Sequence, residues 1–280
     1  LTRRANCELE IALNRRLAAD TYIGVVALGR RGSHLVLEDS HDPVDWLVKM
    51  HRLPREHTLE QLLPDLDTDD PRLAGLIGQL CEFYRKTARA PWNAVEYASS
   101  LNRLSSQSAD RLMLRELEAE HARVRTITEA ALAFVDRNFA LLASRIDAGR
   151  VCDAHGDLRP EHVFLNERPQ IIDCLEFSAE LRQLDAAEEI SFLALECELR
   201  GRADIGEHLH RLYCTACLDD VPRRLFEYYR SQRAMVRAFL SAWHLEEDQD
   251  EETFSHWFEK ARWYISAAES SIARASSETD

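Results

Sequence analysis

The sequence predicts an α+β protein with a small mixed lobe at its amino-terminal end and a larger, mainly helical lobe after it. Residues 1–53 read as one amphipathic helix followed by three β-like runs, whereas residues 54–280 are dominated by apolar residues at three- and four-residue spacing. A short strand–turn–strand pattern at residues 163–172 interrupts the helical part. We therefore expect two lobes, 1–53 and 54–280.

The small lobe is expected to begin with a helix over residues 5–19, where apolar and charged residues alternate at helical spacing. Strands are expected over 22–28 and 34–38, because the turn signal Gly-Arg-Arg-Gly separates them. A third strand is expected over 45–52, where apolar residues alternate before a Leu-Pro stop.

Capping signals and apolar periodicity define the expected helices of the large lobe. Asp70 followed by Pro71 marks a helix start, because an acidic cap and a proline in the first turn are typical there. Asp185 is expected to cap a later helix, and the charge-rich stretch 115–123 is expected to be a solvated face. Besides the helix after Asp70, helices are expected within 109–148 (two), 185–199, 222–244 and 252–273.

The composition narrows the class of protein. The net charge is −14, which argues against a nucleic-acid-binding surface, because phosphate backbones require a basic footprint. An acidic surface can attract a cationic small molecule, although it more often serves solubility. No apolar run approaches the length of a bilayer span and no apolar leader opens the sequence, so we expect a cytoplasmic protein.

The seven cysteines form an odd, scattered set, which favours reduced thiols over a disulfide framework. His208, His210, Cys214 and Cys217 could be drawn as a zinc site. A structural zinc site, however, usually pairs a C-x-x-C with a second ligand pair across a loop, whereas these four residues fall within one expected helix. We interpret them as a helical packing surface.

The clearest chemical pattern is His155-Gly156-Asp157-Leu158-Arg159-Pro160-Glu161-His162, followed by Ile171-Ile172-Asp173. Its spacing is the one that protein kinases show as H-R-D-x-x-x-x-N and D-F-G. In kinases the first aspartate orients and deprotonates the attacking hydroxyl, and the last one holds the magnesium that bridges the nucleotide phosphates. A hairpin over residues 163–172 would bring His162 and Asp173 close enough to share one ion.

Together with the segment 172–177, His155-Gly156-Asp157-Leu158 resembles the aminoglycoside-phosphotransferase-like branch of the kinase fold, including its uncharacterised bacterial members. Residues 10–17, 48–54 and 233–238 resemble the same group, so the resemblance covers most of the chain. It implies a protein-kinase-like fold with a truncated small lobe. It also implies ATP and Mg²⁺ as cofactors and a small-molecule hydroxyl as the phosphate acceptor.

The resemblance assigns roles to the residues of the loop. Asp157 is expected to be the catalytic base, with a helix cap or a salt-bridged surface aspartate as the alternative. Asp173 and His162 are expected to be metal ligands. His162 could instead be an ordinary loop residue in a metal-poor site. Arg159 would stabilise charge on the transferring phosphate, with a plain exposed arginine as the alternative. His155 would support the loop through a ring N–H bound to a carbonyl.

Three residues of the small lobe are expected to contact the nucleotide or the strand lysine that binds its phosphates in kinases. Glu10 would pair with a strand lysine, by its position on the first helix. Val48 and Met50 lie on the strand that would line the adenine pocket, although an edge strand without a ligand explains them equally well.

Two departures from the family pattern leave alternatives open. Position 162 is His where most members have Asn, and imidazole suits Mn²⁺ or Zn²⁺ better than Mg²⁺. No Gly-rich loop or strand lysine precedes the first helix, so the sequence is either a fragment or a protein that does without them. The rival functions are therefore a pseudokinase that binds a nucleotide or a regulatory ligand and, less favoured, metal-assisted hydrolysis through His155, Asp157, His162 and Asp173.

Overall fold

The computed structural model describes residues 2–38 and 41–277. Its chain forms two compact units, each assembled from segments far apart in the sequence. Unit 1 comprises Leu1–Ala88, Cys152–Leu184 and Glu196–Asp219, and unit 2 comprises Arg89–Val151, Asp185–Leu195 and Asp220–Asp280. The lobe boundary expected at residues 53–54 stays a prediction.

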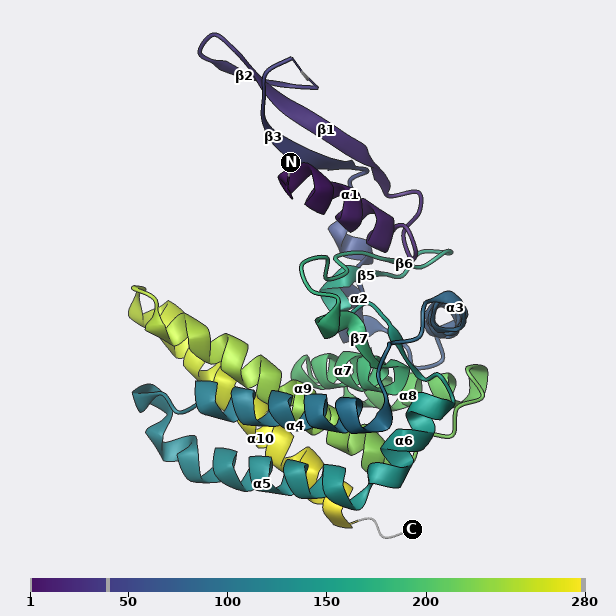
Figure 1. Ribbon diagram of the computed structural model, residues 1–280, viewed down its shortest axis with the longest axis vertical. Coiled ribbons are helices and arrows are strands. Elements are labelled where there is room, and N and C mark those ends of the chain that lie inside the picture. The colour runs from purple at the N-terminus through teal and green to yellow at the C-terminus, as the bar shows by residue number, and fades with distance from the viewer. Residues whose placement is uncertain (1, 39–40, 278–280) are drawn as a thin grey trace. The chain divides into compact units, whose positions relative to one another are not determined.

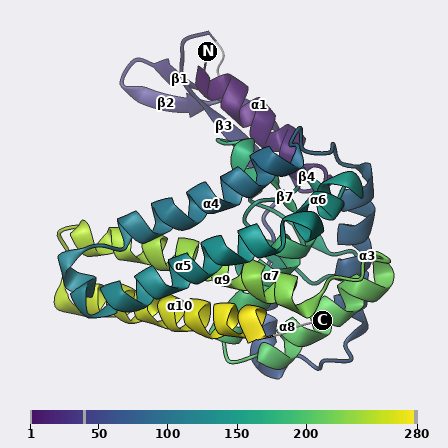
Figure 2. The same cartoon turned by 60° about the horizontal axis from the view of Figure 1, so that its bottom comes forward.

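Figure 1 labels most elements of both units, and β4 is labelled in Figure 2. The helices are α1 (Thr2–Asn14), α2 (Leu59–Leu62), α3 (Pro71–Lys86), α4 (Ala94–Arg111), α5 (His121–Arg137), α6 (Phe139–Asp147), α7 (Ala186–Leu199), α8 (Ala203–Ala216), α9 (Arg223–Trp243) and α10 (Glu251–Ser277). The strands are β1 (Tyr22–Arg31), β2 (His34–Leu37), β3 (Pro43–Met50), β4 (Val151–Asp153), β5 (Val163–Phe164), β6 (Gln170–Ile171) and β7 (Gln183–Asp185).

In unit 1, β1 pairs antiparallel with both β2 and β3, so the sheet has the order β2-β1-β3. Helix α1 packs against β1 and β3, and the core between them is built on Ile11, Ala18 and Tyr22. The three predicted strands are confirmed, and so is the predicted helix, although it ends at Asn14 instead of residue 19. The turn lies later than predicted, because β1 stays paired with β2 through Arg31 and the chain turns at Gly32, where φ is +62°.

Helix α3 begins as predicted, since the side chain of Asp70 accepts a hydrogen bond from the backbone N–H of Arg72. Helices α3 and α8 pack together, and a disulfide joins Cys81 on α3 to Cys217 at the end of α8. The prediction of reduced thiols is therefore wrong for this pair. Packing of two helices brings together sulfurs that are 136 residues apart in the sequence, which cysteine spacing does not reveal.

Unit 2 contains a bundle of α4, α5, α9 and α10, which lie side by side in Figure 2. The helices predicted within 109–148, 222–244 and 252–273 are confirmed as α5 and α6, α9 and α10. Helix α4 was not predicted, and after its end at Arg111 the chain forms a 3-10 segment over Arg115–Glu120. The prediction of a solvated face is wrong for Glu120. This side chain is buried and pairs with Arg123 and Arg262, so its charge is matched across helices instead of by water.

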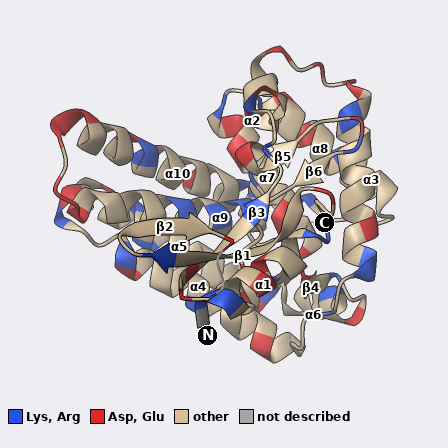
Figure 3. Cartoon of the chain, turned by 90° about the horizontal axis from the view of Figure 1, so that it is seen from above, with Lys and Arg blue, Asp and Glu red and all other residues tan. Residues whose placement is uncertain are grey.

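Charged residues of both signs are spread over the helices in Figure 3. Acidic residues gather in the connection from α9 to α10, which contains Glu246, Glu247, Asp248 and Asp250. Among the residues that the structure describes, no helix combines the length and the apolarity that a membrane crossing requires.

Candidate functional site

The loop that carries Asp157 follows β4 and turns sharply at Gly156, where φ is +89°. A Cβ atom at this position would lie 3.0 Å from Leu175 Cδ1 and 3.1 Å from the carbonyl oxygen of Leu181. Both the positive φ and the close neighbours therefore require glycine. The His-Gly-Asp sequence thus has a local structural reason as well as a chemical one.

His155 is fully buried under this loop. Its Nε2 lies 2.9 Å from the carbonyl oxygen of Ile172, so Nε2 carries the proton and donates. Its Nδ1 then accepts from the backbone N–H of Asp157 at 3.3 Å. Burial lowers the pKa of His155 to about 3, so the ring is neutral. The geometry has the ring N–H contact with a carbonyl that we expected, while a catalytic role stays a prediction.

The predicted hairpin is confirmed, with Val163 opposite Ile171 and Phe164 opposite Gln170. At its open end the backbone N–H of Ile172 donates to the carbonyl of His162 at 3.1 Å. The hairpin therefore brings the residue after β6 next to the residue before β5.

Asp173 has a left-handed backbone conformation with φ of +65°, which is uncommon for a residue with a side chain. Its neighbours hold it there. The Asp173 N–H lies 3.4 Å from the Tyr22 hydroxyl, and the N–H of Cys174 donates to Oδ1 of Asn14 at 2.9 Å. This backbone presents an exposed Asp173 carboxylate toward His162. An observed uncommon conformation of this kind is typical of functional sites.

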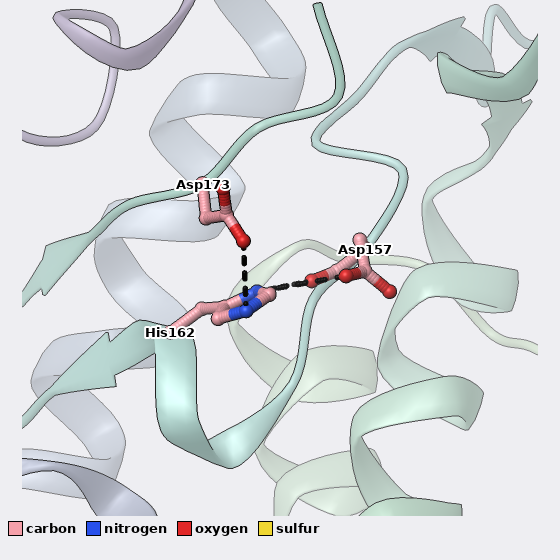
Figure 4. Close-up of side chains that lie close together, drawn as sticks. All are labelled: Asp157, His162 and Asp173. Atoms are coloured by element: carbon pink, nitrogen blue, oxygen red, sulfur yellow. Dashed lines mark hydrogen bonds and ion pairs between the residues drawn. The ribbon is translucent and has the colours of Figure 1, made fainter. Parts of the chain in front are cut away.

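Asp157, His162 and Asp173 converge in unit 1, as Figure 4 shows. One potential ligand atom from each residue lies within 4.8 Å of the others. Nε2 of His162 is 3.0 Å from Oδ2 of Asp173, while Nδ1 donates to the backbone carbonyl of Asp157 at 2.9 Å. Because Nδ1 is committed as a donor, Nε2 is the nitrogen of His162 that can bind a metal.

The two residues on the hairpin are electrostatically coupled. Burial disfavours protonation of His162, but the hydrogen bond with Asp173 and the nearby carboxylates outweigh it, so the pKa of His162 is raised. The same hydrogen bond lowers the pKa of Asp173. The pair thus favours an ionised Asp173 carboxylate and a protonated His162. Nε2 of His162 must lose its proton before it can bind a cation, which then has one oxygen and one nitrogen ligand.

Arg159 lies inside this cluster instead of on a free surface. Its Nε donates to Oδ2 of Asp157 at 2.9 Å, and its guanidinium lies 3.1 Å from Nε2 of His162. A third contact, at 2.6 Å, joins it to Glu161.

The three residues expected to contact the nucleotide or a strand lysine lie outside the Asp157–His162–Asp173 cluster, on α1 and β3 of unit 1. Glu10 is half-buried on α1, and no hydrogen bond or ion pair of its carboxylate is found within the described residues. Burial and the charges of Glu176 and Asp173 raise the pKa of Glu10. On β3, Val48 packs against the core under α1, and Met50 is 39% exposed. Their roles stay predictions.

Arg16 supports the His-Gly-Asp loop through hydrogen bonds that sequence patterns did not reveal. Arg16 donates to the carbonyl oxygens of Asp153 at 2.9 Å and Ala154 at 3.0 Å, immediately before the His-Gly-Asp turn. Its guanidinium carbon also lies over the ring of Phe83, 4.9 Å from the ring centroid. These partners are up to 138 positions away, so no local motif marks them.

No family model matches the chain. Uncharacterized proteins of Mycobacterium bovis and Mycobacterium tuberculosis are 29% identical over 242 residues. The match covers 84% of this chain and 46% of each relative, so the chain spans about half the length of the curated relatives it matches.

Solved structures of glucosamine kinase share the fold. Two crystal forms match 94% of this chain with TM-scores of 0.52 and 0.53, and cover 65% and 68% of that enzyme at 15% identity. A complex of glucosamine kinase with glucosamine, ADP and inorganic phosphate matches 80% of this chain and 64% of the enzyme at 14% identity, with a TM-score of 0.50. The predicted kinase-like α+β fold is therefore confirmed.

Proposed function

We propose that this chain belongs to an ATP-dependent phosphotransferase that acts on a hydroxyl group of a small molecule. The observation that carries the proposal is the convergence of Asp157, His162 and Asp173 on one loop and hairpin of a kinase-like fold. This arrangement supplies both a carboxylate for the attacking hydroxyl and ligands for a metal ion, which phosphoryl transfer requires together.

Each residue has one task in this proposal. The acceptor oxygen attacks the γ-phosphorus, the bond from that phosphorus to the bridging oxygen of ADP breaks, and the hydroxyl proton passes to Asp157. Oδ2 of Asp157 accepts from Arg159, so Oδ1 is the oxygen that would receive the proton. Arg159 would also stabilise charge on the transferring phosphate.

Asp173 and His162 would hold the metal ion. A bound divalent ion neutralises charge on the nucleotide phosphates. The donor set of one carboxylate and one imidazole accepts Mg²⁺, but it suits Mn²⁺ better.

We propose an amino sugar or a related cationic alcohol as the acceptor class. The fold is shared with glucosamine kinase, one structure of which contains glucosamine and ADP. The resemblance to aminoglycoside-phosphotransferase-like enzymes favours the same class. The net charge of −14 is compatible with attraction of a cationic acceptor.

A second candidate is a nucleotide-binding module without catalysis. It is favoured by the ion pair between Arg159 and Asp157, which engages the expected base. Because the relatives are about twice as long as this chain, the remaining parts of a phosphotransferase site could also come from a longer protein.

The proposal is tested with γ-labelled ATP, Mg²⁺ or Mn²⁺, and a panel of aminoglycosides, glucosamine and neutral sugars. We expect label transfer to at least one amino-bearing alcohol, and loss of transfer by a factor of about 10²–10⁴ in Asp157→Asn. Metal-dependent ATP binding without transfer to any acceptor would favour the non-catalytic module. Transfer that is unchanged in Asp157→Asn would contradict the assigned base.

A further inference from the structure

A chain of alternating charges leads away from the candidate base. Asp157 accepts from Arg159, and Arg159 donates to Oε1 of Glu161 at 2.6 Å. Oε2 of Glu161 in turn accepts from Arg200 at 2.9 Å. Glu161 thus uses one oxygen for each of two guanidinium groups and connects the loop to the end of α7.

Arg200 is the fixed end of this series of ion pairs. One nitrogen of its guanidinium donates to both the carboxylate and the backbone carbonyl of Glu196, at 2.9 and 3.0 Å. The other nitrogen donates to Glu60 and to Glu161, each at 2.9 Å. The side chain of Glu196 is only 1% exposed. A planar guanidinium held at several points has little rotational freedom, which makes it a rigid anchor.

The position of Arg159 depends on this anchor. Glu161 lies on the 3-10 turn Pro160–His162, and 28% of its side chain is exposed, so water competes for its carboxylate. Its contact with Arg200 fixes that carboxylate, and the carboxylate fixes one side of the Arg159 guanidinium. The opposite side of the guanidinium then faces Asp157 and His162.

We propose that Glu161 and Arg200 are positioning residues that hold Arg159 against Asp157 and so orient the candidate base. The expected effect on phosphotransfer rests on the proposed function. The expected effect on the position of Arg159 does not depend on it. Neither residue is assigned contact with the nucleotide or the acceptor; both act through Arg159. Misplacement of a reacting group by about 1 Å costs roughly 10²-fold in rate, so an anchor outside the site can matter for catalysis.

The variants are chosen to distinguish loss of the Arg159–Glu161–Arg200 ion pairs from a general loss of folding. Glu161→Gln keeps the size of the side chain, but its amide offers one acceptor oxygen and one donor nitrogen, so it cannot bridge two guanidinium groups. Arg200→Met removes the anchor, and Arg200→Lys restores its charge without the fork. Arg202→Met is the matched control. Arg202 follows the same helix, is similarly exposed (19% against 21%), and pairs with Asp204.

The first readout is the Nε–H signal of Arg159 in ¹H–¹⁵N NMR, assigned by its loss in Arg159→Lys. The hydrogen bond to Asp157 should slow its exchange with water. We expect Glu161→Gln and Arg200→Met to accelerate that exchange by about tenfold or more, since each 1.4 kcal/mol of lost protection is tenfold. Arg202→Met should leave it unchanged. Equal exchange in all four proteins would overturn the proposal, as would equal acceleration in the control.

The second readout is the kinetics of phosphotransfer. We expect kcat to fall about ten- to a hundred-fold in Glu161→Gln and Arg200→Met while the KM for ATP stays within about twofold, with partial recovery in Arg200→Lys. A raised KM at unchanged kcat would contradict a positioning role. If the wild type shows no phosphotransfer, the proposed function fails, and the Arg159 exchange rate alone decides whether the anchor exists.

Discussion

At the scale of single residues, backbone conformation explains why the candidate site sits where it does. Gly156 turns the chain so that Asp157 follows the buried His155. Asp173 takes a left-handed conformation held by the Tyr22 hydroxyl and by the Asn14 side chain, which accepts from the N–H of Cys174. Residue types in the motif could be read from the sequence, because their spacing is short. The support from Tyr22 could not, because it comes from 151 positions away.

The first prediction concerns Gly156. Gly156→Ala should lower the free energy of unfolding by about 1–3 kcal/mol, because alanine at φ of +89° is strained and its Cβ would meet Leu175 and Leu181. Gly78→Ala is the control. Gly78 lies within α3, and an added Cβ there meets nothing within 4 Å, so alanine should stabilise by about 0.5–1 kcal/mol. Urea unfolding measures both, and a neutral Gly156→Ala would refute the strain argument.

The second prediction concerns metal choice at His162. With Asn at this position the site would present only oxygen ligands, so His162→Asn should shift preference from Mn²⁺ toward Mg²⁺. The measurement is ATP affinity under competition between the two metals, for wild type and variant. An identical metal ranking in both proteins would mean that His162 is not a ligand and that the metal site rests on Asp173 alone.

At the scale of elements, periodicity and capping predicted α1, α3, α9, α10 and the β5–β6 hairpin well, because local forces define these elements. Periodicity failed after α4, where Glu120 is buried against arginines of α5 and α10. A run of charges looks the same in the sequence whether water or a partner helix matches it. The same limit hid the contact between Glu161 and Arg200, which are 39 positions apart.

The third prediction follows from Glu120. Burial opposes its charged form, but hydrogen bonds from Arg262 and Arg123 outweigh burial and lower its pKa. A carboxyl whose folded pKa is lowered stabilises the fold above its unfolded pKa, near ~4.3, and loses that contribution as the pH falls toward the folded value. Glu120→Gln should therefore flatten the loss of stability below about pH 4.3.

Urea unfolding at pH 7 and at several values below pH 4.5 would measure this effect. Glu118→Gln, which changes an exposed carboxylate on the same 3-10 segment, is the control and should keep the wild-type slope. Identical slopes in wild type and Glu120→Gln would show that the bridge between α5 and α10 does not govern the acid sensitivity of unit 2.

At the scale of the whole molecule, the kinase-like fold could be predicted from one motif and the order of its elements, and the match to glucosamine kinase confirms it. The division into units could not be read from order alone. Unit 1 recruits the segments Cys152–Leu184 and Glu196–Asp219, and long-range packing decides such assignments. The candidate site belongs entirely to unit 1, so its geometry can be tested without reference to the placement of unit 2.

The central claim is that this chain carries a metal-dependent nucleotide site. The most direct test is ATP binding with and without a divalent metal, measured through the melting temperature of the protein. A ligand that binds only the folded state stabilises it, by about 2.7 kcal/mol at a ligand concentration of a hundred times Kd, and therefore raises the melting temperature. We predict a rise with ATP and Mn²⁺ in wild type, the same rise in Asp157→Asn, and a lost or much smaller rise in Asp173→Ala. No rise in well-folded wild type, or equal rises in all three proteins, would contradict a nucleotide site whose metal ion is held by Asp173.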